Sequence, residues 1–177
     1  RYTENLTETP FKGSIHDYFC AQSYNQFRPV FDLVYVQVGE PAKYASTYSD
    51  DENSQYLVQD AIEVLKQNSN INWSLYDWNG DGEVDQILII YAGKGQADGG
   101  SENTIWPHKY EVTYYKTITE QGKTFRIYNC NPEMNAYTQH YMGIGTFCHE
   151  FGHVLGLPDI YSTDGNTVHK TCGEWDL

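Results

Sequence analysis

The sequence contains no apolar run of about 18 residues, so none of its segments is predicted to span a membrane. Basic residues are scarce, because 11 lysines and arginines stand against 24 aspartates and glutamates, for a net charge of −13. This acidity argues against a nucleic acid partner, whose phosphates would be repelled, and is compatible with divalent cations, a secreted habitat or solubility alone. Internal repeats are also absent, and 177 residues suit a single domain with a sizeable core.

Cysteines are few and widely spaced, at positions 20, 130, 148 and 172. Because no CxxC motif is present, a thiolate zinc knuckle and a thioredoxin-type redox pair are both disfavoured. The even number permits two disulfides in three possible pairings, and the sequence does not rank these pairings. Cys148 directly precedes a histidine, and we predict that it is a small buried residue rather than a metal ligand.

Periodicity predicts an α+β fold in which a β-sheet is backed by helices. Two apolar segments have the pattern of strands, one alternating and one continuous, and a pair flanking TEQG indicates a β-hairpin. The helices are predicted from an apolar face or from an apolar run that ends at Gly156. The expected elements are a short helix within 16–27, strands at 31–38 and 86–93, a helix at 56–67, the hairpin at 111–130 and a late helix at 142–156.

Residues 149–159, which read HEFGHVLGLPD, carry the pattern with the most chemical content. On a helix, His149 and His153 lie one turn apart on the same side, so both imidazoles can reach one Zn²⁺ ion. Glu150 lies next to that face, close enough to hydrogen-bond a zinc-bound water without being a ligand. The pattern therefore predicts two metal ligands and a glutamate base on the late helix. A pair of hydrogen-bonded core histidines is the alternative, which the following residues disfavour.

A catalytic zinc needs a third protein ligand and an open position for water. Gly156 can end the helix at positive φ and turn the chain, and Pro158 stiffens the returning segment. Asp159 is therefore the predicted third ligand, and two histidines with a carboxylate are a sound ligand set for zinc. The structural alternative for Asp159 is an N-cap or Asx-turn role after the helix. The other candidates for the third ligand are Asp164, His169 and Glu174.

The segment CHEFGHVLGLPDIYSTDG, residues 148–165, resembles the immune inhibitor A-like M6 family of zinc metallopeptidases. Three further segments resemble the same family, namely DWNGDGEVDQILIIYAG, IWPHKY and GEWDL. The resemblance covers about residues 31–177 and implies a metzincin-like zincin, in which a twisted mixed β-sheet is backed by helices and an active-site helix carries HExxH. It also implies an exported zinc endopeptidase in which His149, His153 and Asp159 hold the metal and Glu150 is the base.

In such families a methionine-containing turn lies beneath the zinc, and GEWDL is similar to the segment that leads to it. The sequence ends at Leu177, where the methionine would come next. We therefore expect residues 1–177 to form a single catalytic domain, composed of the N-terminal subdomain and the active-site helix. The C-terminal subdomain with the methionine turn is expected to lie beyond residue 177.

The resemblance implies a zinc-dependent endopeptidase that hydrolyses protein or peptide substrates, through a zinc-bound water activated by Glu150. Tyr161 and His108 are candidates for a second electrophile, although Tyr161 is more typical of a residue packed beside the site and His108 of a structural histidine. One alternative is a degenerate module that acts in binding or adhesion, and another is a zinc hydrolase of a non-peptide substrate. The family resemblance implies a secreted or cell-surface location, in bacteria.

A second candidate metal site lies in DWNGDGEVD, residues 77–85. Its oxygen-bearing side chains have the spacing of the first part of an EF-hand calcium loop, and Gly82 holds the position of the sharp turn. The twelfth position is Leu88 instead of a bidentate glutamate, and a strand follows, so the loop is EF-like and not an EF-hand. The alternative is an Asx and glycine turn that leads into a strand. The candidate calcium ligands are Asp77, Asn79, Asp81, Glu83 and Asp85.

Overall fold

The computed structural model describes residues 13–45, 53–68, 70–112 and 117–159. Within these ranges the chain is α+β, as predicted, and no helix is long and apolar enough to cross a lipid bilayer. The helices are α1 (Ile15–Gln22), α2 (Ser54–Asn68) and α3 (Gly145–Val154), with the 3-10 turns η1 (Pro41–Tyr44) and η2 (Trp73–Tyr76). The strands are β1 (Glu83–Val84), β2 (Ile87–Lys94), β3 (His108–Glu111), β4 (Ile118–Glu120), β5 (Lys123–Phe125) and β6 (Ile127–Met134).

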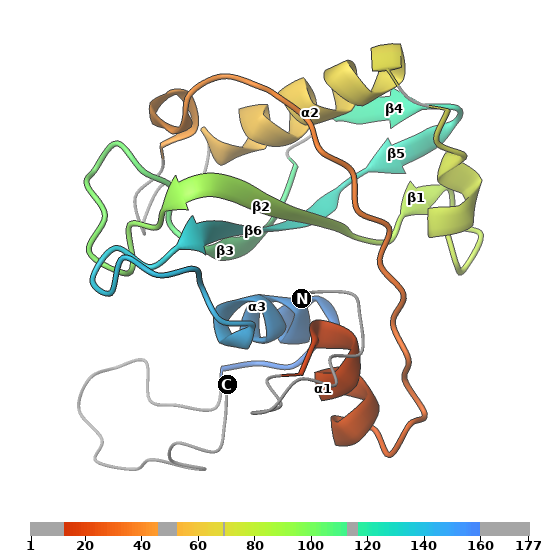
Figure 1. Ribbon diagram of the computed structural model, residues 1–177. Helices are drawn as coiled ribbons and strands as arrows, with labels where there is room; N and C mark the ends of the chain where they lie inside the picture. Colours follow the sequence, from red (N-terminus) through yellow and green to blue (C-terminus); the bar gives the residue numbers. More distant parts are fainter. Residues whose placement is uncertain (1–12, 46–52, 69, 113–116, 160–177) are drawn as a thin grey trace.

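The strands form two three-stranded mixed sheets, in the orders β1-β5-β4 and β2-β6-β3. In each sheet the central strand pairs parallel with one neighbour and antiparallel with the other. Arg126 alone separates β5 from β6, and residues 85–86 separate β1 from β2, so the two sheets continue one another along the same chain segments (Figure 1). The twisted mixed sheet that was predicted is thus present in two consecutive parts.

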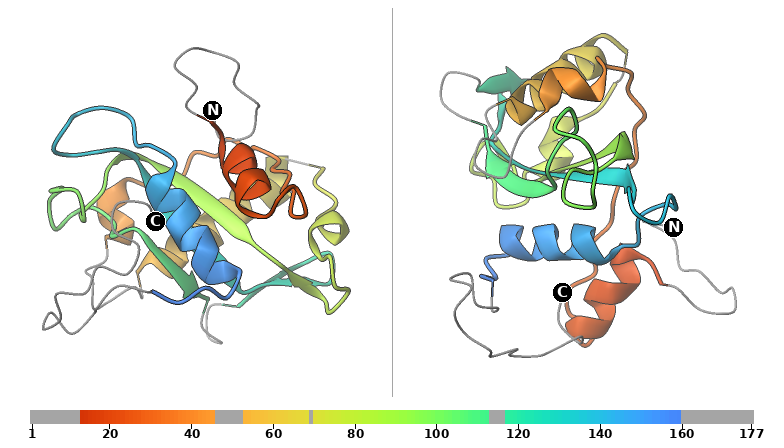
Figure 2. Two further views of the ribbon diagram at one scale, coloured as in Figure 1. Left: turned by 90° about the horizontal axis from the view of Figure 1, so that it is seen from below. Right: turned by 90° about the vertical axis from the view of Figure 1, so that its left-hand side faces the viewer.

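Helices cover both faces of the β2-β6-β3 sheet, with α2 on one face and α1 and α3 on the other (Figures 1 and 2). The alternation of side chains along β2 divides its apolar run between the two layers. Ile87, Ile89 and Tyr91 contact the core beneath α2. Leu88 and Ile90 contact the core formed with α1 and α3. A strand buried on both faces needs a continuous apolar sequence, and this is why QILIIYAG has one.

Helix α1 begins with a capping box and supports α3. The Ser14 hydroxyl accepts a hydrogen bond from the backbone amide of Asp17, whose carboxylate in turn accepts one from the Ser14 amide. Phe19 of α1 packs edge-to-face on Phe151 of α3, with ring centroids 5.1 Å apart. The predicted short helix within 16–27 is confirmed, and its function in the fold is to cover α3 from the side opposite the sheet.

Most of the predicted elements are confirmed, with small shifts in their ends. The predictions at 56–67, 86–93 and 142–156 correspond to α2, β2 and α3. The hairpin at 111–130 is present: β4 and β5 pair around Gln121 and Gly122, both of which have positive φ, and farther from the turn β3 pairs with β6. Positive φ at both central positions is the conformation that matches a two-residue turn to the twist of a hairpin.

The predicted strand at 31–38 is wrong. This segment is extended but belongs to neither sheet, and most of its side chains are exposed. Side-chain contacts hold it instead, because Phe31 packs on Phe151 of α3 with ring centroids 5.9 Å apart, and Asp32 accepts a hydrogen bond from the Tyr76 hydroxyl at 2.7 Å. The β-branched alternation reflects suitability for a pleated surface, and strand formation also requires a neighbouring strand.

Candidate metal centre

The C-terminal end of α3 sets up the site by reversing the chain. Gly156 has φ +90°, and its amide donates to the carbonyl of His153 at 3.1 Å, while the amide of Leu157 donates to the carbonyl of Gly152 at 3.0 Å. These two bonds are the pattern of a Schellman motif, which glycine permits because it has no Cβ. The helix therefore stops where the sequence predicted, and residues 157–159 return toward it.

The returning segment also orients His153. The Nδ1 atom of His153 lies 2.8 Å from the carbonyl oxygen of Leu157. A carbonyl only accepts, so Nδ1 carries the proton and the lone pair lies on Nε2. A backbone carbonyl that holds the second imidazole nitrogen is the usual partner of a metal-binding histidine. The contact between His153 and the carbonyl of Leu157 was not predicted from the sequence. Gly156, which turns the chain back toward the helix, was the one signal for it.

The structure brings the three predicted ligands together. The Nε2 atoms of His149 and His153 lie 3.1 Å apart, and Asp159 Oδ1 lies 3.4 Å from each of them. Three ligands about 2.0–2.1 Å from a tetrahedral Zn²⁺ would be roughly 3.3–3.4 Å from one another. Within the described ranges, this is the group of three metal-type ligands whose atoms converge. The spacing fits zinc, and side chains 23–32% exposed leave one side of the site open to solvent.

Glu150 lies beside this triangle in a more buried position, with 9% of the residue exposed. Burial raises the pKa of its carboxyl above the usual range, while the neighbouring His149 and His153 and the backbone amide of Lys109 act to lower it. The amide of Lys109 belongs to β3, so the edge of the sheet holds the carboxylate. Because almost every residue has a backbone amide, the sequence does not show which amide donates to Glu150, and this contact could not have been predicted.

His108 lies in a structural position and not at the metal centre. It is 7% exposed, its Nδ1 lies 2.5 Å from the carbonyl oxygen of Trp106, and its Nε2 lies 3.1 Å from the hydroxyl of Tyr128. Both ring nitrogens therefore have protein partners, one just before β3 and one on β6, which agrees with the structural interpretation of this histidine. The other candidates, Tyr161 as an electrophile and Asp164, His169 and Glu174 as ligands, lie outside the described residues.

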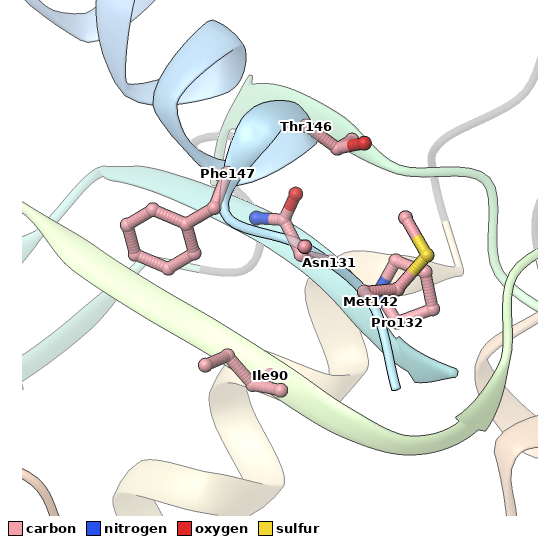
Figure 3. Close-up of a pocket in the computed structure, with 7 residues that line it drawn as sticks. Ile90, Asn131, Pro132, Met142, Thr146 and Phe147 are labelled. Carbon is pink, nitrogen blue, oxygen red and sulfur yellow. The ribbon is translucent and has the colours of Figure 1, made fainter. Parts of the chain in front are cut away.

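A small cavity lies behind the first turn of α3. Figure 3 shows the Asn131 side chain directed toward the start of the helix, between Thr146 and Phe147. The lining contains neither Glu150 nor any of the three converging ligands, so this cavity is separate from the metal centre. The residues that line it are Ile90, Asn131, Pro132, Met142, Gly143, Thr146 and Phe147.

The cysteines within the described ranges, at positions 20, 130 and 148, are buried and form no disulfide with one another. Disulfide pairing among these three is thus excluded, and Cys172 lies outside the described residues. Burial raises the pKa of the Cys148 thiol to about 12, so this side chain stays protonated near neutral pH. A metal ligand would have to be a thiolate, which supports the prediction that Cys148 is a packing residue.

The loop at 77–85 is held together by its own backbone. The carboxylate of Asp77 accepts hydrogen bonds from the amides of residues 80–82 at 2.8–3.1 Å. Asp85 accepts one from the amide of Trp78 at 2.6 Å. Lys123 of β5 places its Nζ 2.5 Å from Asp77 Oδ2. These contacts are those of an Asx and glycine turn neutralised by a lysine, whereas calcium ligation by the loop stays a prediction.

We predict that replacing Lys123 by Met lowers the melting temperature, because the Asp77 side chain is 1% exposed and would lose its cation. Lys66→Met is the matched control, since Lys66 pairs with Glu63 and Glu120, whose side chains are 59% and 29% exposed, and a smaller decrease is expected. Differential scanning calorimetry measures both. Equal decreases in the two variants would contradict the role given to Lys123. A rise in the melting temperature on adding Ca²⁺ would instead support cation ligation by this loop.

The same ion pair predicts how stability depends on pH. Lys123 holds the pKa of Asp77 below its usual 3.8. A carboxyl with a lowered folded pKa contributes stability that is complete above the unfolded pKa and is lost as pH falls through the folded value. The stability difference between the protein and its Asp77→Asn variant should therefore shrink as pH falls below about 3.8.

Comparison with known proteins shows which family the chain belongs to. The protein-family model for the catalytic domain of immune inhibitor A peptidase M6 matches residues 5–177. The chain belongs to the M6 peptidase family. The "Pre-pro-metalloprotease PrtV" of Vibrio cholerae is 29% identical over 149 residues, which are 73% of this chain and 16% of that protein. "Immune inhibitor A" of Bacillus thuringiensis subsp. alesti is 34% identical over 146 residues, which are 68% of this chain and 20% of that protein.

Membership of the M6 peptidase family confirms the resemblance read from the sequence, and the α+β fold is compatible with a metzincin-like peptidase domain. The chain spans about a fifth or less of the length of these relatives. The M6 match extends over α3 and its turn, where the atoms of the three predicted ligands converge.

Proposed function

We propose that residues 1–177 form the catalytic domain of a zinc endopeptidase, in a protein that bacteria secrete or carry on the cell surface. The observation that carries this proposal is the convergence of two imidazole nitrogens and one carboxylate oxygen within 3.4 Å of one another, beside the buried Glu150. The M6 family match and the metalloprotease name of one relative support the same function. Bacterial relatives, one of them named as a pre-pro form, support the location.

The donor set favours zinc over the hard cations. Two neutral imidazoles and one carboxylate are a catalytic zinc set, while Ca²⁺ and Mg²⁺ prefer shells of oxygen ligands. We assign His149, His153 and Asp159 as the ligands. When bound, Zn²⁺ supplies a Lewis acid that polarises water and the scissile carbonyl. Calcium at residues 77–85 stays a separate prediction.

Glu150 is the proposed general base. Its carboxylate takes the proton of the attacking water and then gives it to the nitrogen of the leaving amine. The amide of Lys109 holds the carboxylate, so the proton acceptor is fixed before substrate arrives. The raised pKa of Glu150 makes it a better proton acceptor than an exposed glutamate, although a bound cation would lower that pKa again.

The outer edge of β3 favours an extended peptide as the substrate. Within the described residues β3 pairs only with β6, and the amide of Val112 points inward to the carbonyl of Arg126. Amides alternate along a strand, so those of Lys109 and Glu111 point outward, and the amide of Lys109 reaches Glu150. The amide of Lys109 is taken by Glu150, so an extended peptide would pair with the carbonyl of Lys109 and with the amide and carbonyl of Glu111. It would therefore pass beside the base.

Two other functions were considered from the sequence. A degenerate binding or adhesion module would be expected to lose the base or a ligand, but Glu150 and all three ligands are present and converge. A zinc hydrolase of a non-peptide substrate shares the ligand set, but its substrate would not pair with a strand edge beside the base. The retained base and ligands and the position of the β3 edge therefore favour the peptidase.

Metal analysis combined with a proteolysis assay tests the proposal. The full-length protein should be purified without chelators. It is expected to contain one equivalent of zinc. Casein or gelatin hydrolysis should fall to background after treatment with a chelator and return on adding Zn²⁺ but not Mg²⁺. Proteolysis that survives complete removal of the metal would refute the function, and a metal-free protein as purified would refute the zinc assignment.

A further inference from the structure

Helix α1 carries a second cluster of chemically active side chains, remote in sequence from the metal centre. His16 and Cys20 lie one helical turn apart, and His16 Nε2 is 3.3 Å from Cys20 Sγ. On its other side, His16 Nδ1 is 2.7 Å from the carbonyl oxygen of Pro29. The imidazole is therefore held between a thiol and a backbone carbonyl.

The carbonyl of Pro29 determines which nitrogen of His16 carries the proton. Because the oxygen of Pro29 only accepts, the Nδ1 of His16 must be the donor, and the neutral ring then has its lone pair on Nε2. The thiol of Cys20 accordingly donates its proton toward Nε2. A nucleophile, a base and a third group that orients the base are the arrangement that activates a cysteine.

The position of Cys20 differs from that of the other described cysteines. Cys130 and Cys148 lie inside the two cores, with 0% and 2% of the residue exposed. Cys20 retains 8% and is followed by the exposed residues Ala21 and Gln22 at the end of α1, while His16 is half-buried. A small reagent therefore reaches Cys20 more readily than either of the others.

We propose that Cys20 is a reactive thiol, activated by His16, and that small disulfides are the class of compound that modifies it. In the reaction, His16 Nε2 takes the thiol proton and Cys20 Sγ attacks one sulfur of the reagent. The sulfur–sulfur bond of the reagent breaks as a mixed disulfide forms on Cys20. The second sulfur leaves as a thiolate and takes the proton from His16, so the reagent is the oxidant and no other electron acceptor is needed.

This site lies next to the contact that fixes α1 on the helix of the metal centre. Phe19, the neighbour of Cys20, packs edge-to-face on Phe151 of α3, which lies between the two histidine ligands in sequence. The group added to Cys20 would therefore lie on α1, next to the contact between α1 and α3. The reactivity of the thiol itself is independent of the peptidase function and is measured without a proteolysis assay.

The experiment treats the native full-length protein with 2,2′-dipyridyl disulfide at pH 7 and follows each cysteine by peptide mapping. Cys20 should be labelled at least about tenfold faster than Cys130 and Cys148, which serve as controls within the same molecule. His16→Asn keeps a donor near the carbonyl of Pro29 but removes the base, and labelling of Cys20 should slow by roughly tenfold. His140→Asn, which changes an exposed histidine, should leave the rate unchanged.

Two results would overturn the proposal. One is labelling of Cys20 no faster than that of Cys130 and Cys148 in the native protein. The other is an unchanged rate at Cys20 in His16→Asn, with Cys130 and Cys148 still protected, since their protection shows that the fold is intact. If His16→Asn exposes these two cysteines, His16→Gln replaces it as the test variant and is judged by the same rate.

Discussion

Replacing Glu150 by Ala is expected to abolish measurable proteolysis while zinc stays bound. General acid–base catalysis contributes about 10²–10⁴-fold, so kcat should fall by at least that range, whereas KM should change little. The reason is geometric, because Glu150 lies beside the three ligands without being one of them. Peptide hydrolysis and zinc content are measured on the same preparation, so that loss of the base and loss of the metal are told apart.

The controls separate chemistry from packing. Glu150→Gln keeps the volume of the buried side chain and should be as inactive as Glu150→Ala, because an amide does not accept the proton. Glu102→Gln changes an exposed glutamate outside the site and should retain normal activity. Full activity in either Glu150 variant would refute its assignment as the base, and zinc loss from Glu150→Gln would show that the residue supports the metal instead.

Removing a ligand is expected to cost the metal itself. Residues that only support ligands cost about 10–100-fold in metal affinity, so loss of a direct ligand in His153→Ala or Asp159→Ala should exceed that range. Activity should disappear with the zinc, at a metal concentration that saturates the unmodified protein. Competition with a zinc chelator of known affinity measures the affinity, and activity at excess Zn²⁺ tests whether the remaining ligands still support catalysis.

Substitutions of exposed residues of the same types serve as controls for the ligand variants. His140→Ala removes an exposed histidine and Glu102→Ala an exposed carboxylate, so both should bind zinc as the unmodified protein does. The decisive outcome concerns Asp159. If Asp159→Ala binds zinc with unchanged affinity, the third ligand is another residue, and Asp164, His169 and Glu174 become the next candidates for substitution.

The parts of the site that the sequence predicted depend on short spacings along one helix and its turn. His149 and His153 face the same side because a helix turns through about 100° per residue, whatever surrounds it. Gly156 ends the helix because positive φ carries little strain only for glycine. The apolar run of β2 likewise identified a buried strand. Each prediction required only the local geometry of the backbone.

The failures and omissions share the opposite cause. The alternating pattern at 31–38 has the composition of a strand, but a strand exists only where another strand pairs with it. The hydrogen bond from the Lys109 amide to Glu150 involves a backbone group that every residue possesses. The ion pair of Lys123 with Asp77 joins residues 46 positions apart and no pattern connects them.

By itself the sequence determined which side chains are candidates for metal binding, the spacing of the histidines and the place where the helix stops. The tertiary structure alone decided that Asp159 Oδ1 returns to within 3.4 Å of both imidazoles, that the edge of β3 holds Glu150, and that Lys123 lies on Asp77. The physical reason is range: backbone conformation is set by a few neighbouring residues, while the convergence of side chains depends on how separate elements pack.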